Sequence, residues 1–177
     1  MSRHAIFLDR DGVINVDYGY VYKKENFEFI DGIFDFCYKA RKRGYLIFVI
    51  TNQSGIGRGY FTEKQFLELS DWMINCFRNR GIKIAKVYYC PYHKDAKIKK
   101  FKKENSFFRK PNPGMINQAI KEYNIDPEKS ILIGDKISDV ISGIKAGVKN
   151  NFLYQGEATN SNEYKSITNF KEAIKHL

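Results

Sequence analysis

Two aspartates spaced two residues apart are the first residues of the chain whose type and spacing suggest catalysis. The stretch FLDRDG, Phe7 to Gly12, places Asp9 and Asp11 directly after a short apolar segment. Close carboxylates repel each other unless a cation or a shared proton relieves the repulsion. A carboxylate can attack phosphorus to form an aspartyl phosphate, and a second one can protonate the departing alkoxide and then deprotonate water. We therefore take Asp9 as candidate nucleophile and Asp11 as candidate general acid and base.

Polar residues also follow later apolar segments. They are Thr51 to Gly55, Gly134 to Lys136, and Arg109 with Lys110 just before a helical pattern. Mg²⁺ prefers a few carboxylates together with water and phosphate oxygens, so Asp9 and Asp135 are its candidate ligands. Thr51 and Lys110 are suitable donors to the oxygens of a transferring phosphoryl group. Together these residue types predict magnesium-dependent phosphoryl transfer.

Alternating strands and helices must position these residues. Short apolar segments predict strands over residues 4–8, 46–50, 86–89, 131–133 and 152–154. Helical patterns cover residues 32–43, 114–123, 137–146 and 166–177, and a further helix begins at the capping box Thr62 to Gln65 and ends near Gly81. This order predicts a single α/β domain over residues 1–177, with a mainly parallel sheet and helices on both faces. The ligand crevice of such a sheet lies at the carboxyl ends of its strands.

Composition narrows the environment and the partners. The 177 residues are 43% hydrophobic, which suits one compact core, and we find neither a signal peptide nor a membrane span. Three cysteines without a regular spacing favour a reducing compartment, so we expect a cytoplasmic protein. The net charge of +10 indicates anionic partners, and six lysines lie between Lys94 and Lys103. That run is either a solvated loop or a surface that attracts an anionic substrate or a polyanion.

Four segments resemble, in order, the motifs of the haloacid dehalogenase (HAD) superfamily of phosphatases. They are FLDRDG, VITNQSGIGRG, FRKPNPGM and ILIGDKISD, and the similarity runs from about Ala5 to Tyr154. Within this superfamily the chain resembles the D-glycero-D-manno-heptose 1,7-bisphosphate 7-phosphatase group, a near relative of the histidinol-phosphatase domain. The resemblance implies a Rossmann-like (HAD-like) fold without a cap domain. It also implies removal of the 7-phosphate in ADP- or GDP-heptose synthesis for lipopolysaccharide or capsule.

The resemblance also assigns roles to matching residues. Asp9 would be the nucleophile, Asp11 the general acid and base, and Asp9, Asp135 and the main-chain carbonyl of Asp11 the magnesium ligands. Asp139 would orient its neighbours, and Asp17 to Val21 (DYGYV) resembles a substrate-contacting flap. The expected substrate-binding residues are Asp9, Arg10, Asp11, Asp17, Gly19, Tyr20, Thr51, Asn52, Gln53, Ser54, Arg109, Lys110 and Lys136.

One segment departs from the family pattern. The family commonly binds a structural zinc through a cysteine and histidine cluster and a Cys-x-Cys pair before Arg-Lys-Pro. Here only Cys90 and His93 remain, because Ser106 and Phe108 stand where the later thiolates would be. Two ligands do not complete a tetrahedral site, so we expect no zinc. Tyr92, Phe101, Phe107 and Phe108 are the candidates to pack this loop instead.

Several alternatives stay open. A histidinol-phosphate phosphatase is the nearest one, and a polynucleotide 3′-phosphatase or a nucleic-acid binding module would explain the charge. A phospho-accepting receiver domain would lack the acid at the position of Asp11. DYGYV and Arg109 favour the sugar bisphosphate, and we expect a monomer that acts on this small molecule without nucleic acid or membrane. The preferred anomer cannot be assigned from these residues.

Overall fold

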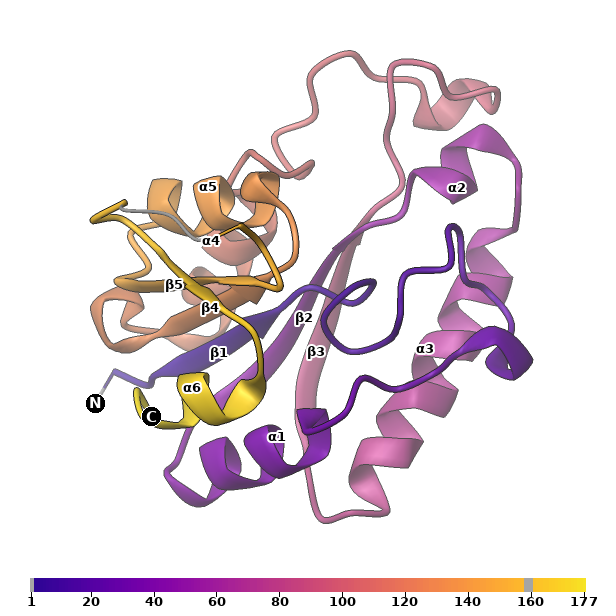
Figure 1. Ribbon diagram of the computed structural model, residues 1–177. Helices are drawn as coiled ribbons and strands as arrows, with labels where there is room; N and C mark the ends of the chain where they lie inside the picture. Colours follow the sequence, from indigo (N-terminus) through magenta and orange to yellow (C-terminus); the bar gives the residue numbers. More distant parts are fainter. Residues whose placement is uncertain (1, 158–160) are drawn as a thin grey trace.

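The computed structural model describes residues 2–157 and 161–177, and its centre is a six-stranded sheet (Figure 1). The strand order is β3-β2-β1-β4-β5-β6, and every neighbouring pair is parallel. The strands are β1 (Ala5–Leu8), β2 (Leu46–Asn52), β3 (Ile84–Cys90), β4 (Ile131–Gly134), β5 (Asn150–Tyr154) and β6 (Lys165–Ile167). The predicted α/β architecture with a parallel sheet is therefore confirmed.

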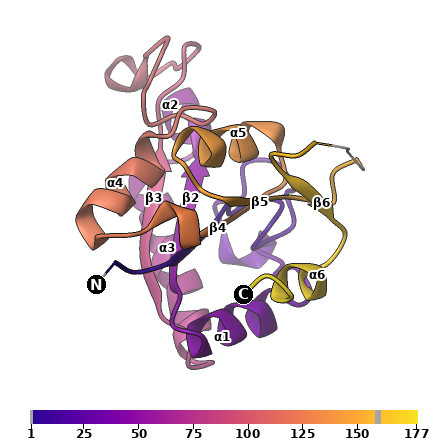
Figure 2. The same ribbon diagram turned by 90° about the vertical axis from the view of Figure 1, so that its left-hand side faces the viewer.

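Helices cover both faces of this sheet (Figure 2). They are α1 (Ile33–Lys42), α2 (Ser54–Arg58), α3 (Glu63–Arg78), α4 (Gly114–Tyr123), α5 (Ile137–Lys145) and α6 (Phe170–Ile174). Short 3₁₀ turns are η1 (Lys24–Asn26), η2 (Lys99–Phe101) and η3 (Pro127–Lys129). The connections 9–32 and 91–113 contain only η1 and η2, so neither one carries a cap domain. None of the described helices is long and apolar enough to cross a membrane.

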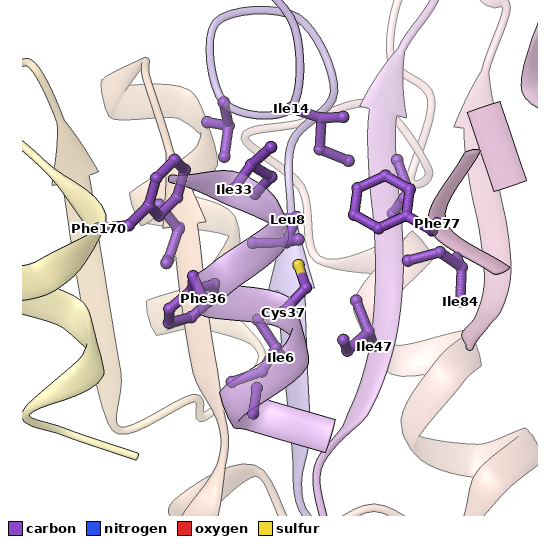
Figure 3. Close-up of a cluster of buried hydrophobic side chains, with 14 of the residues drawn as sticks. Ile6, Leu8, Ile14, Ile33, Phe36, Cys37, Ile47, Phe77, Ile84 and Phe170 are labelled. Carbon is purple, nitrogen blue, oxygen red and sulfur yellow. The ribbon is translucent and has the colours of Figure 1, made fainter. Parts of the chain in front are cut away.

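Alternation along the strands divides the core into two layers. On one face, Ile6 and Leu8 of β1 pack with buried residues of α1, α3 and α6, and Figure 3 shows this layer with Phe36, Phe77 and Phe170. On the other face, Phe7 of β1 belongs to a second buried cluster that includes residues of α4. Successive side chains of a strand point to opposite faces of the sheet. Both faces are covered here, so all four residues of β1 are buried. The site-bearing loop that follows β1 therefore starts from the centre of the molecule.

The predicted helix over residues 166–177 is wrong at its start. Residues Lys165–Ile167 form the edge strand β6, which pairs with β5, and α6 begins only at Phe170. The side chain of Asn169 accepts a hydrogen bond from Lys171 N–H at 3.0 Å and so caps α6. The edge strand is short and half exposed, which is why its sequence lacks the continuous apolar run of the central strands.

Helix α2 was not predicted, because its sequence SGIGR contains two glycines that weaken helix propensity. Packing requires at least one of them. A Cβ at Gly57 would lie 2.6 Å from the carbonyl oxygen of Pro91. By contrast, the predicted capping box of α3 is confirmed: Thr62 Oγ1 accepts from Gln65 N–H at 3.1 Å, and Gln65 Oε1 accepts from Thr62 N–H at 2.8 Å.

Candidate active site

The ends of β1 and β4 and the first turn of α5 bring three carboxylates together. One carboxylate oxygen from each of Asp9, Asp135 and Asp139 can be chosen so that all three lie within 4.8 Å of one another. Gly12 allows the loop after β1 to approach this cluster: its φ is +88°, and a Cβ there would lie 2.3 Å from Asp135 Oδ2. The glycine behind the two aspartates is thus required by a close contact between the two loops.

Lys110 enters the same cluster from the segment before α4. Its Nζ lies 2.9 Å from Asp9 Oδ1 and 2.5 Å from Asp139 Oδ1, and it donates to the carbonyl of Ile50 at 2.9 Å. Burial disfavours the charged amine, but Asp139 and Asp9 nevertheless raise the pKa of Lys110 above its usual range. Asp139 also accepts from the Lys136 N–H at 3.0 Å. Asp139 therefore contacts both lysines of the site, as expected for a residue that orients its neighbours.

Lys110 alone compensates the negative charge of the three carboxylates only in part, so a metal ion would stabilise the cluster. Burial, together with the charge of Asp139, holds the pKa of Asp9 well above its usual range despite Lys110. Burial likewise raises the pKa of Asp135 to about 6. Asp135 Oδ1 is buried and has no hydrogen-bond partner among the described residues. An unpartnered carboxylate oxygen beside two other acids is the donor set that Mg²⁺ accepts, so the residues fit this ion.

Asp11 points away from this cluster and is held by three side chains. Its Oδ1 accepts from Arg10 Nη2 at 2.8 Å and from Asn15 Nδ2 at 3.1 Å. Its Oδ2 accepts from Arg10 Nε at 3.2 Å and from Gln53 Nε2 at 3.0 Å. Asn15 was not among the predicted site residues, and nothing in its sequence context distinguishes it from an ordinary turn residue.

The side chain of Arg10, an expected substrate-binding residue, lies away from the cavity. Its side chain is 1% exposed, lies beneath Asp11 and is not among the residues that line the pocket. Its neighbours in sequence both line the pocket. The direction of a side chain after the strand end was not readable from the motif. The side chain of Arg10 contacts the site through Asp11, whereas its backbone N–H donates to Asp9 Oδ1 at 2.7 Å.

Residues at the end of β2 organise the opposite wall. Gln53 Nε2 donates to Thr51 Oγ1 at 2.8 Å as well as to Asp11, so one amide connects Thr51 with Asp11. Asn52 pairs with the backbone of Lys110: its Nδ2 donates to the Lys110 carbonyl and its Oδ1 accepts from the Lys110 N–H, both at 3.1 Å. These contacts fix the segment that carries Lys110 to the strand that carries Thr51.

These groups open into one cavity of about 580 Å³. Twelve of the expected residues line it, namely Asp9, Asp11, Asp17, Gly19, Tyr20, Thr51, Asn52, Gln53, Ser54, Arg109, Lys110 and Lys136. Gly55, Pro111, Ser138 and Asp139 complete the lining. Gly55, Pro111 and Ser138 were missed, although each lies inside a quoted motif. Asp135 stays behind the cavity wall, where its carboxylate faces Gly12.

The segment Asp17 to Val21, which we call the flap, forms part of the rim. Asp17 Oδ1 accepts from Gly19 N–H at 3.0 Å, and Asp17 Oδ2 lies 3.1 Å from Lys136 Nζ. Burial opposes ionisation of Asp17, but these two donors hold its pKa below the usual value. Tyr20 has a φ of +53° and stacks edge-on against Tyr60 at 4.6 Å between ring centroids. The flap is thus tied to Lys136 on one side of the cavity and to the segment after α2 on the other.

The loop that carries Arg109 is held by packing against helices α2 and α3 and by contacts among its own residues. Phe101 and Ala96 are buried against Ile56 and Phe66, and Tyr92 packs beside them. Ser106 Oγ accepts from Phe108 N–H at 3.3 Å and lies 3.9 Å from Cys90 Sγ. Phe107 and Phe108 are 56% and 40% exposed, so the expectation that they pack this loop is wrong.

Arg109 and His93 are each anchored separately within this loop. Arg109 Nη1 donates to the carbonyl of Tyr92 at 3.2 Å. The ring of His93 lies against Arg58, with 3.2 Å between His93 Nε2 and Arg58 Nη2. Burial and the nearby charges of Arg109 and Arg58 lower the pKa of His93. The guanidinium of Arg109 therefore reaches the cavity from a loop that is packed against α2.

Comparisons with known proteins agree with this fold and site. A family model described as HAD-hydrolase-like matches residues 107–176. A HAD-like protein of Mesorhizobium loti superposes with a TM-score of 0.92 at 30% identity over 99% of this chain and 86% of that one. A D,D-heptose 1,7-bisphosphate phosphatase from B. bronchiseptica, complexed with magnesium and phosphate, superposes with a TM-score of 0.83 at 22% identity over 97% and 96%. The fold and the carboxylate site define a HAD-like hydrolase.

Comparison with curated relatives identifies the family within the HAD-like hydrolases. The chain is 50% identical over 149 residues to the D-glycero-beta-D-manno-heptose-1,7-bisphosphate 7-phosphatase of Haemophilus influenzae, covering 84% of this chain and 80% of the relative. It is 51% identical over 153 residues to the alpha-anomer enzyme of Burkholderia mallei, covering 86% and 80%. The chain belongs to the family of D-glycero-D-manno-heptose-1,7-bisphosphate 7-phosphatases.

Proposed function

We propose that this protein is a magnesium-dependent phosphatase that removes the 7-phosphate of D-glycero-D-manno-heptose 1,7-bisphosphate. The observation that carries the proposal is the placement of Asp9, Asp11, Thr51 and Lys110 around one open cavity that Arg109 and Lys136 also line. These two cations suit a substrate with a second phosphate. Family relatives named for the same substrate support the choice.

The reaction proceeds in two displacements. An oxygen of Asp9 attacks phosphorus, the bond from phosphorus to the sugar oxygen breaks, and the proton of Asp11 goes to that oxygen. A water molecule then attacks the aspartyl phosphate, its proton goes to Asp11, and the bond from phosphorus to Asp9 breaks. Lys110 and Thr51 hold the phosphoryl oxygens where negative charge accumulates.

Magnesium would be held by Asp9, by Asp135 and by the main-chain carbonyl of Asp11. When bound, it neutralises charge on the phosphoryl group and on the crowded carboxylates. The unpartnered Oδ1 of Asp135 and the raised pKa of Asp9 both favour a cation at this place. Magnesium in the related B. bronchiseptica structure supports the choice of ion.

The remaining properties of the protein are proposals as well. We propose a single-domain monomer that needs no structural zinc, since the loop between Cys90 and Phe108 is held by packing around Phe101. The three cysteines are free thiols, which supports a cytoplasmic location. A role in heptose nucleotide synthesis follows from the proposed substrate.

The test is phosphate release with magnesium from a panel of phosphate esters. It contains both anomers of heptose 1,7-bisphosphate, histidinol phosphate, fructose 1,6-bisphosphate and a 3′-phosphorylated oligonucleotide, ranked by kcat/KM. We expect a heptose anomer to lead, and the ratio of the two anomers assigns the preference. Identity does not assign it, because the beta and alpha relatives are equally similar at 50% and 51%.

Asp9→Asn is the control variant for the mechanism. It should abolish release from every substrate, because an amide does not form the aspartyl phosphate. Highest activity on histidinol phosphate or on the oligonucleotide would be consistent with the proposed mechanism but would contradict the proposed substrate. Activity retained by Asp9→Asn would overturn the mechanism itself.

A further inference from the structure

Arg10 is a buried cation whose position the proposed mechanism does not yet use. Its side chain is 1% exposed, and Nη1 is buried without a hydrogen-bond partner in the part of the chain that the structure describes. A buried guanidinium with an unsatisfied nitrogen costs free energy, so apolar packing does not explain its presence. The contacts that Arg10 does make connect two parts of the site.

The first contact is a two-point contact with Asp11. Nη2 donates to Asp11 Oδ1 at 2.8 Å, and Nε donates to Asp11 Oδ2 at 3.2 Å. Such a planar fork fixes both the position and the rotation of a carboxylate, which a single donor does not. Asn15 donates only to Asp11 Oδ1 and Gln53 only to Asp11 Oδ2. Of these side chains, Arg10 alone contacts both oxygens and so defines the plane of the carboxylate.

The second contact is with the flap. The same Nη2 donates to the carbonyl of Val21 at 2.7 Å. Rings of Phe27 and Phe66 lie 6.0 and 5.6 Å from the guanidinium carbon, so the group is held between the segment after the flap and helix α3. One nitrogen atom therefore contacts both Asp11 and the last residue of the flap.

We propose that Arg10 is a positioning residue that sets the carboxyl group of Asp11 for proton transfer and couples it to the flap. The inference rests on the proposed function and deepens it. When Val21 and the rest of the flap are in place, Arg10 holds Asp11 in one orientation; when the flap moves, the shared Nη2 loses one of its two partners. The side chain of Arg10 does not line the cavity and acts through Asp11.

Pre-steady-state kinetics with p-nitrophenyl phosphate test the proposal independently of the natural substrate. Its leaving group departs without a proton, whereas hydrolysis of the aspartyl phosphate still needs Asp11 as base. In Arg10→Met and Arg10→Lys we expect a rapid burst of nitrophenol, about one per active site, followed by a steady state slowed ~10²-fold, as for Asp11→Asn. Because burst amplitude counts folded sites, partial unfolding does not change the rates. A burst and a steady state that fall together would overturn the proposal.

A double-mutant cycle separates positioning from a general structural effect. Arg10→Met should slow turnover ~10²-fold in the wild-type background and less than about 3-fold in the Asp11→Asn background. If the turnover losses of the two single variants multiply in the double variant, Arg10 does not act through Asp11. Arg41→Met is a matched control, because Arg41 also donates to a backbone carbonyl, that of Tyr45 at 2.9 Å, but in the α1 region. It should leave turnover unchanged.

Hydrogen exchange tests the coupling to the flap. Amide exchange in residues 17–22 should rise in Arg10→Met and stay at the wild-type rate in Arg41→Met. Unchanged exchange in Arg10→Met would remove the flap from the proposal. Absence of heptose bisphosphatase activity in the wild-type protein would overturn the substrate instead, while the nitrophenyl phosphate burst would still report on Arg10.

Discussion

Asp135 and Lys110 lie on either side of the same acid cluster but differ in what their removal does to the fold. Asp135 carries a buried oxygen that has no hydrogen-bond partner within residues 2–157 and 161–177, and burial raises its pKa to about 6. Lys110 is the buried cation that compensates Asp9 and Asp139. Substitutions at these two residues therefore separate catalytic loss from structural loss.

Asp135→Asn should stabilise the metal-free protein, because it removes a largely buried charge that Lys136, 3.8 Å away, only partly compensates. We expect the free energy of unfolding at neutral pH to rise by about 1–3 kcal/mol. Magnesium should raise the melting temperature of the wild-type protein and leave that of the variant unchanged. Thermal unfolding with and without magnesium measures both effects, and an equal magnesium shift in the two proteins would remove Asp135 from the proposed ligand set.

Lys110→Met should act in the opposite direction. Removing the ammonium leaves Asp9 and Asp139 buried without their cation, so we expect a loss of about 3–5 kcal/mol of stability together with the loss of turnover. Urea unfolding in the absence of magnesium is the measurement. A variant as stable as the wild type would show that the two carboxyl groups are neutral in the metal-free protein.

The motifs and the family resemblance were enough to predict most of the residues that line the cavity, because most of the motifs occur where strands end. They were not enough to predict side-chain direction. Arg10 lies between two residues that line the pocket and is nevertheless buried, since its guanidinium bends back to Val21 and to the rings of Phe27 and Phe66. A contact of this kind depends on distant segments and has no local sequence pattern.

At the scale of elements, Glu122 connects helix α4 to strand β3. One of its carboxylate oxygens lies 2.7 Å from Lys86 Nζ and accepts from the Tyr88 hydroxyl at 2.6 Å. The other accepts from Gln118 Nε2 at 2.7 Å. Hydrogen bonds from Lys86, then Tyr88 and Gln118, lower the pKa of Glu122 from 4.5 to about 2.

This pKa shift predicts that Glu122 stabilises the fold at neutral pH and that the stabilisation is lost in acid. A lowered pKa means that the contribution of Glu122 is complete above pH 4.5 and is lost as the pH falls through about 2. Wild type should therefore be more stable than Glu122→Gln at pH 6, and the difference should shrink as the pH falls through this range. Glu68→Gln, on the exposed face of α3, is the control. A difference that does not depend on pH would contradict the assignment.

Elements were predicted well where they are long enough to show an apolar pattern and poorly where they are short. The central strands and the helices α1, α3, α4 and α5 have apolar patterns set by burial on the sheet. Helix α2 and strand β6 are short, and their conformation depends on neighbours: Gly57 fits against Pro91, and β6 pairs with β5. The loop between Cys90 and Phe108 is similar, because Phe101 packs on α2 rather than within its own segment.

At the scale of the whole molecule, the excess positive charge lies partly beside the cavity. The exposed lysines Lys97, Lys99 and Lys100 belong to the loop whose Phe101 packs against α2, and α2 begins at Ser54 in the cavity wall. They do not line the cavity themselves. Their contribution to substrate capture must act through the long-range field, which salt screens.

Replacing these three lysines by glutamine should lower kcat/KM for the bisphosphate at low ionic strength by about 3–10-fold and leave kcat unchanged. The salt dependence of kcat/KM should become flatter than in wild type. The same change at Lys42, Lys83 and Lys149, exposed residues that precede strands β2, β3 and β5 at the opposite edge of the sheet, is the charge-matched control. Equal effects of the two triple variants would mean that only net charge matters.

The aromatic cluster beneath the flap gives the protein an internal optical probe. Trp72 is the single tryptophan of the chain, and its ring lies 5.4 Å from that of Phe27 and 5.8 Å from that of Phe29. Phe27 is also one of the two rings beside Arg10. All tryptophan emission therefore originates one ring away from the residue that joins Asp11 to Val21, so fluorescence intensity can follow rearrangements around the flap in real time without any added label.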